Sequence, residues 1–106
     1  MPKFRLFRDR HVAIRNFYKA NTDSGRVVLN YVRVGNHISL HAAVPDNEKF
    51  QPIIKAFGGQ WRVGVQAWSF RGQDLKVIRG ACAMLYGEDR IVEIRNNRVR
   101  VENLME

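Results

Sequence analysis

The fold is decided by residues 26–44, which read RVVLNYVRVGNHISLHAAV. Two runs rich in β-branched residues, Arg26–Val34 and His37–Val44, are separated by the dipeptide Gly35-Asn36. Both of these residue types accept the positive φ angles of a two-residue hairpin turn. The stretch therefore predicts two antiparallel strands joined by a tight turn.

The residues before this hairpin also show a period of two. Lys3–Arg8 alternates polar and apolar positions, and so does the first part of Val12–Lys19. Residues 21–25, NTDSG, are a cluster of turn formers that separates these runs from the hairpin. We therefore expect a four-stranded meander over the first 44 residues.

The pattern after residue 44 becomes helical. Asp46 or Asn47 is suited to cap a helix, Pro52 fits its first turn, and Gly58-Gly59 is suited to end it. The apolar residues of this segment recur at i, i+3, i+4 and i+7: Phe50, Ile53, Ile54 and Phe57. The sequence thus predicts one amphipathic helix packed on the sheet.

Two more hairpins and a second helix complete the expected order. We predict a hairpin of Gln60–Val63 with Gln66–Phe70, a helix from Asp74 to Gly87, and a hairpin of Ile91–Arg95 with Arg98–Glu102. The fold class is then α+β, with one domain over residues 1–106 and the order ββββ-α-ββ-α-ββ. Because helices follow hairpins, we expect an antiparallel sheet with both helices on one face.

The composition is that of a basic globular protein. The formal net charge is +8, and 13 of the 18 basic residues are arginine, which binds phosphate with a planar fork. The basic N-terminus has no apolar run behind it, so we expect no secretory signal, and no run is long enough to span a bilayer. The single cysteine, Cys82, cannot form an intrachain disulfide, which favours a cytoplasmic protein, with nucleoid association as one option.

Strand alternation predicts a surface on which cations and aromatic rings interleave. If the apolar residues of the leading strands face the helices, the opposite face carries Arg5, Phe7, Arg15, Phe17, Lys19, Tyr31 and Arg33. Such a face suits single-stranded nucleic acid, because cations follow the phosphates and rings stack on bases. Core packing, a homodimer contact, or a strand register shifted by one residue would give the same set of rings another explanation.

Residues 53–70 contain a second notable pattern, a helix end followed by a hairpin with a tryptophan on each arm. The spacing lets Trp61 and Trp68 meet across the strand pair, which by itself is a packing device. The form K-x-x-G-G-x-W-x6-W-x-F resembles an element of HARP-type domains of annealing helicases and of small plasmid- and phage-encoded modules. The matching positions are Lys55, Gly58, Gly59, Trp61, Trp68 and Phe70.

This resemblance implies association with DNA, particularly with forks or single strands, and an origin in a mobile element. The chain departs from the pattern after the first tryptophan, where Arg62-Val63 stands in place of Asn or Asp followed by Pro, and Arg71 replaces a further proline. Arg62 and Arg71, at the edges of the hairpin, are additional candidates for contact with a ligand.

The sequence offers no pattern for metal or cofactor chemistry. His37 and His41 are too far apart on one strand to share an ion, and no phosphate loop or nucleophile motif occurs. The pair Glu93 and Arg95 has the form of a nuclease motif, but scattered acids produce such pairs by chance. We therefore predict a protein that is not an enzyme, with no cofactor and no metal.

The predicted function is sequence-tolerant binding of nucleic acid, DNA more than RNA, favouring single strands or junctions. Arginine and lysine would contact phosphates and aromatic rings would stack on bases. The alternative is a phage- or plasmid-type inhibitor or adaptor that binds an acidic host protein, with the same rings as anchors. Exposed strand edges also predict a homodimer, and no membrane partner is expected.

Overall fold

The computed structural model describes the backbone of residues 2–99 and the side chains of residues 11–99. Its elements are α1 (Pro2–Asp23), β1 (Val27–Val34), β2 (His37–Ala43), α2 (Asn47–Phe57), β3 (Gln60–Arg62), β4 (Ala67–Arg71), η1 (Gly72–Asp74), α3 (Leu75–Tyr86), η2 (Glu88–Arg90) and β5 (Ile91–Arg95). The α+β class is confirmed. The predicted order is wrong, because one long helix replaces the first two strands.

α1 forms because the apolar residues of its second half recur at helical spacing. Four residues at i, i+3, i+4 and i+7 are buried on one side: Ile14, Phe17, Tyr18 and Asn21. The alternation that suggested a strand depended on Val12, which is 42% exposed and lies outside this buried stripe. The strands predicted at Lys3–Arg8 and Val12–Lys19, and the four-stranded meander, are therefore wrong.

The elements predicted from local signals are confirmed. Val34 lies opposite His37, so the β1–β2 hairpin turns at Gly35-Asn36 as expected. The carboxylate of Asp46 accepts hydrogen bonds from the backbone N–H groups at the start of α2, at 3.0 and 3.4 Å. α2 ends at Gly58, whose φ of +66° is the left-handed conformation expected at a helix C-terminus.

The second half of the chain follows the prediction as far as it is described. β3 and β4 form the predicted hairpin, and α3 lies between Asp74 and Gly87, although the Asp74 side chain makes no capping hydrogen bond. After β5 the chain turns at Asn96-Asn97, and Arg95 forms an isolated bridge with Arg98. The rest of the strand predicted at Arg98–Glu102 lies outside the described residues from position 100 onward.

The sheet is mixed, with the strand order β3-β4-β2-β1-β5. Its neighbours pair antiparallel except β1 and β5, which are parallel with Val27 opposite Ile91. The prediction of a purely antiparallel sheet is wrong because α3 carries the chain back across the sheet, so β5 enters in the same direction as β4. Such a return connection through a helix is the usual route to a parallel pair.

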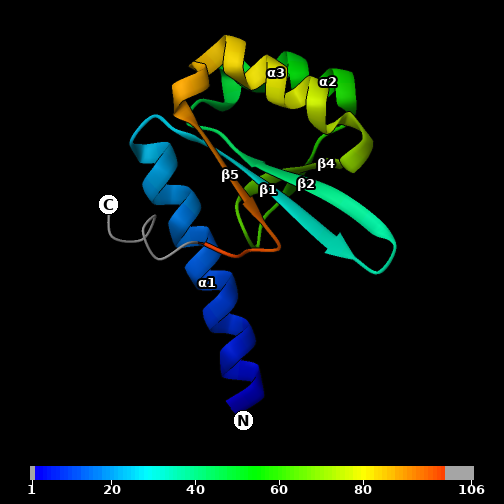
Figure 1. Cartoon of the computed structure of the whole chain (residues 1–106). Helices are drawn as coiled ribbons and strands as arrows, with labels where there is room; N and C mark the ends of the chain where they lie inside the picture. Colours follow the sequence, from blue (N-terminus) through cyan, green and yellow to red (C-terminus); the bar gives the residue numbers. More distant parts are fainter. Residues whose placement is uncertain (1, 100–106) are drawn as a thin grey trace.

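Helices cover both faces of the sheet. α2 and α3 lie side by side on one face, as predicted, and α1 crosses the other (Figure 1). We call α2 and α3 with their flanking residues 44–59 and 72–90 the helical layer, and the sheet face that contacts α1 the α1 face. Since both faces carry helices, an exposed sheet face no longer supports the predicted homodimer, and the free edges are β3 and β5.

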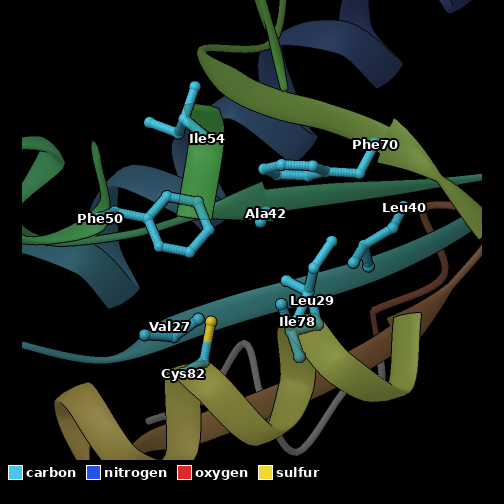
Figure 2. Close-up of a cluster of buried hydrophobic side chains, with 9 residues drawn as sticks. All are labelled: Val27, Leu29, Leu40, Ala42, Phe50, Ile54, Phe70, Ile78 and Cys82. Carbon is cyan, nitrogen blue, oxygen red and sulfur yellow. The ribbon is translucent and has the colours of Figure 1, made fainter. Parts of the chain in front are cut away.

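The main core lies between the sheet and the helical layer. Phe50 and Phe70 meet edge to face at 5.8 Å between ring centroids, and Cys82 of α3 lies close to Val27 of β1 (Figure 2). A second cluster lies under α1 and joins it to all the longer strands: Ile14, Phe17, Tyr18, Val28, Ala43, Ala67 and Ile94. The predicted inward position of Val28 is therefore wrong, because Val27 and Leu29 face the helical layer and Val28 faces α1.

Candidate functional site

Charge is divided unevenly between the two sides of the sheet. The helical layer contains five basic and five acidic residues, so its formal net charge is zero. α1 contains six basic and two acidic residues, and β3 and β4 add two arginines to the α1 face, which brings this side to +6 of the total +8. The charges on the α1 side are Lys3, Arg5, Arg8, Asp9, Arg10, Arg15, Lys19, Asp23, Arg62 and Arg71.

The strand register places both of these arginines on the α1 face. Arg62 lies opposite Ala67, which belongs to the cluster under α1, and directly opposed residues of an antiparallel pair share a face. Arg71 follows Ala67 by four residues on the same strand and therefore points to the same side. Both side chains are exposed.

Cations on the two sides differ in how they are neutralised. In the helical layer, Arg79 donates hydrogen bonds to the carboxylates of Glu88 and Glu93, which raises the pKa of Arg79 and lowers that of Glu88. Within the described part of the chain, Arg15, Arg62 and Arg71 have no ion-pair partner. The α1 side thus presents cations whose charge no neighbouring acid compensates.

A hollow of about 240 Å³ opens beside the second half of α1. Arg15 and Lys19 line it from α1, Asn47 from the start of α2, and Trp61 and Gln66 from the β3–β4 hairpin. The Lys19 ammonium lies 3.0 Å from a carboxylate oxygen of Asp23, but both side chains are largely exposed, so the pair is weak. The hollow therefore combines two cations, an indole ring and side-chain amides.

The two tryptophans meet across the hairpin as predicted. Trp61 lies opposite Trp68, with ring centroids 5.1 Å apart and planes inclined at 61°. The indole N–H of Trp68 donates to the side-chain oxygen of Asn47 at 3.1 Å, which fixes the hairpin against the start of α2. Trp68 packs on the main core, whereas Trp61 remains 42% exposed at the hollow.

His41 lies near the cations of the α1 face. It is on β2, opposite Ser69 of β4, and its Nδ1 atom is buried with no hydrogen-bond partner within the described residues. Burial lowers the pKa of His41, and the positive charge of Arg62 lowers it further. The imidazole is therefore neutral at neutral pH and adds no charge to this face.

The predicted binding residues do not share one face. Phe17 is only 7% exposed and packs under α1, so its ring is not accessible to a base. Tyr31 lies on the opposite side of the sheet, partly buried against the main core, with the guanidinium of Arg95 5.7 Å from its ring centroid. Arg33 is exposed beside Tyr31, where both line another hollow. The predicted platform of interleaved rings and cations is therefore wrong.

Four of the predicted cations do lie on the α1 side, namely Arg15, Lys19, Arg62 and Arg71. Arg5 and Phe7 belong to the first half of α1, and their side chains lie outside the described residues. Sequence reasoning missed Trp61 as an accessible ring, because it assigned both tryptophans to packing. The signal was present in the shortness of β3, since a short edge strand leaves its side chains partly uncovered.

Comparison with known proteins finds no matching family model, no matching curated protein and no matching solved structure. The similarity of residues 53–70 to the HARP-type element therefore remains a resemblance. Within the described residues, no group of three or more His, Cys, Asp or Glu side chains is placed to hold a metal ion. No helix among the described residues is both long and apolar enough to cross a membrane.

Proposed function

We propose that the protein binds nucleic acid through its α1 side. The observation that carries this proposal is the separation of charge, with a net charge of +6 on α1 and the adjoining sheet face and none on the helical layer. A ligand with closely spaced negative charges gains most from such a one-sided surface. Nucleic acid is the polyanion that also suits an accessible indole ring among the cations.

Binding of this kind depends on phosphate contacts and tolerates different sequences. Arg15, Lys19, Arg62 and Arg71 are the described cations that would contact phosphates, and arginine can do so with two parallel hydrogen bonds. DNA is the expected partner more than RNA, with single strands or junctions preferred over plain duplex. No chemical step is part of the proposal, and cytoplasmic location follows from the partner.

A pair of charge-matched double variants tests the proposal. Arg15→Ala with Arg62→Ala removes two cations from the α1 side, while Lys55→Ala with Lys76→Ala removes two exposed cations from the helical layer. Affinity for fluorescent oligonucleotides is measured by polarisation at several salt concentrations. The first variant should bind more weakly and reduce the slope of log K against log salt by about 1.4 to 1.8. The second should retain the slope of the unmodified protein.

Two outcomes would contradict the proposal. Equal losses in both variants would mean that total charge, and not the α1 side, determines binding. Absence of salt-dependent binding to any oligonucleotide would favour the alternative partner, an acidic protein that the same cations would attract.

A further inference from the structure

We infer that the hollow beside Trp61 holds one unpaired nucleobase, with a phosphate on Arg15, so that the protein selects single strands over duplex. This inference rests on the proposed function and adds the site and the form of the ligand. The observation behind it is that an exposed ring, an unpaired guanidinium and free amide groups line the same hollow.

The Trp61 ring is held in place before any ligand binds. One side of the indole contacts Trp68, whose N–H is bonded to Asn47 of α2. The turn that follows β3 is closed by a hydrogen bond of 2.7 Å from the N–H of Gln66 to the carbonyl of Arg62, and Val65 packs on the cluster under α1. The hairpin is thus anchored to both helices that flank the hollow, and little side-chain entropy is lost on stacking.

The lining also supplies polar groups for the edge of a base. The Asn47 oxygen accepts the Trp68 N–H, which leaves the Asn47 NH₂ group free to donate. The amide of Gln66 makes no hydrogen bond within the described part of the chain and can both donate and accept. Bases differ in their edges but share a flat face, so stacking with adaptable amides suits a sequence-tolerant site.

The dimensions of the hollow favour a single nucleotide. Its volume of about 240 Å³ lies below the usual range for sites that enclose drug-sized ligands. A base inside a duplex is stacked on both faces and must leave the helix before it can contact Trp61, which costs a few kcal/mol. An unpaired base has no such cost, and this difference would produce the strand preference.

The intrinsic fluorescence of Trp61 provides a direct test. The chain has only two tryptophans, so Trp68→Phe leaves Trp61 as the sole indole and retains a ring opposite it. We expect single-stranded oligothymidine and thymidine 5′-phosphate to quench this fluorescence. Inorganic phosphate, the probe for the cations alone, should bind without quenching, and the matched Trp61→Phe variant, which leaves only Trp68, should show little response.

Affinity measurements then test strand preference. Trp61→Ala should weaken binding of the single strand about 5- to 150-fold, the range of one lost base–ring stack, and leave duplex affinity unchanged. Trp61→Phe keeps a smaller ring and should fall between Trp61→Ala and the unmodified protein. Circular dichroism of each variant confirms that the fold is retained.

The outcomes separate this inference from the proposed function. If Trp61→Ala weakens single strand and duplex equally, or neither, while Arg15→Ala with Arg62→Ala still weakens both, the base site is wrong and nucleic-acid binding stands. Quenching by inorganic phosphate equal to that by the nucleotide would also overturn the base site. If no nucleic acid binds at all, the proposed function fails and the inference fails with it.

Discussion

Replacing Tyr18 with phenylalanine should destabilise the protein far more than the loss of one surface hydroxyl. Asn30 is fully buried at the centre of the sheet, and its NH₂ group donates to the Tyr18 hydroxyl and to the Asn97 side-chain oxygen, both at 2.7 Å. The Asn30 oxygen accepts the backbone N–H of Asn97 at 3.3 Å. This network joins α1, β1 and the turn after β5.

Tyr18→Phe retains the ring but leaves one buried N–H of Asn30 without an acceptor. An unsatisfied buried donor costs about 1–3 kcal/mol, and in a domain of this size each kcal/mol lowers Tm by about 4–8 °C. Urea unfolding followed by circular dichroism should therefore show a lower free energy of unfolding with an unchanged m-value. Tyr86→Phe is the matched control, because its hydroxyl donates to the carbonyl of Asp46 where water can replace it, and about 0.5 kcal/mol or less should be lost.

The same tyrosine gives the stability a dependence on alkaline pH. Burial raises the pKa of Tyr18 from 10.0 to about 12, although the hydrogen bond from Asn30 opposes this effect. Because the unfolded chain ionises first, this contribution to stability is complete below pH 10 and disappears as the pH rises to 12. Tyr18→Phe should reduce the alkaline loss. If Tyr18→Phe unfolds at the same urea concentration as Tyr86→Phe, the buried network contributes nothing and the reasoning is refuted.

Three further predictions concern single side chains. Burial and Arg62 lower the pKa of His41 from 6.5, so its contribution to stability is complete above pH 6.5 and declines as the pH falls through the folded-state value; an NMR titration should show this lowered pKa, and Arg62→Ala should raise it. Gly80→Ala should raise the free energy of unfolding by about 0.5–1 kcal/mol, because the new methyl meets nothing within 4 Å, whereas Gly59→Ala should lower it, because its methyl would lie 2.7 Å from a ring carbon of Phe70; equal effects in urea unfolding would contradict this. Burial raises the pKa of Cys82 to about 12, so a thiol reagent should label it only as the protein unfolds, and rapid labelling of the folded protein would show the site to be open.

Elements specified by local signals could be predicted from the sequence, whereas α1 could not. The Asp46 cap, the Gly58 helix end and the Gly35-Asn36 turn each depend on a few adjacent residues, and all three occur as expected. The second face of the sheet was misassigned because residues 27–29, Val-Val-Leu, were interpreted as alternating. A continuous apolar run is typical of a strand covered on both faces, and all three residues are completely buried.

The candidate site was predictable only for its cations. Arginines such as Arg15 and Arg62 remain solvent-accessible in almost any arrangement, so their involvement did not depend on the strand register. The rings did depend on it, and Phe17 changed from an exposed strand position to a buried helix position. The parallel pairing of β1 with β5 was not predictable locally, since its partners are far apart in the sequence.

The position of β5 has a consequence for the order in which the chain can reach its final form during synthesis. β1 lies in the interior of the sheet, yet one of its two neighbours is the last strand to leave the ribosome. Ile94 of that strand also completes the apolar contact beneath α1. The first helix made therefore cannot dock fully until translation is nearly finished, and a chain stopped after Gly87 would release a protein with an open strand edge and a loosely attached basic helix.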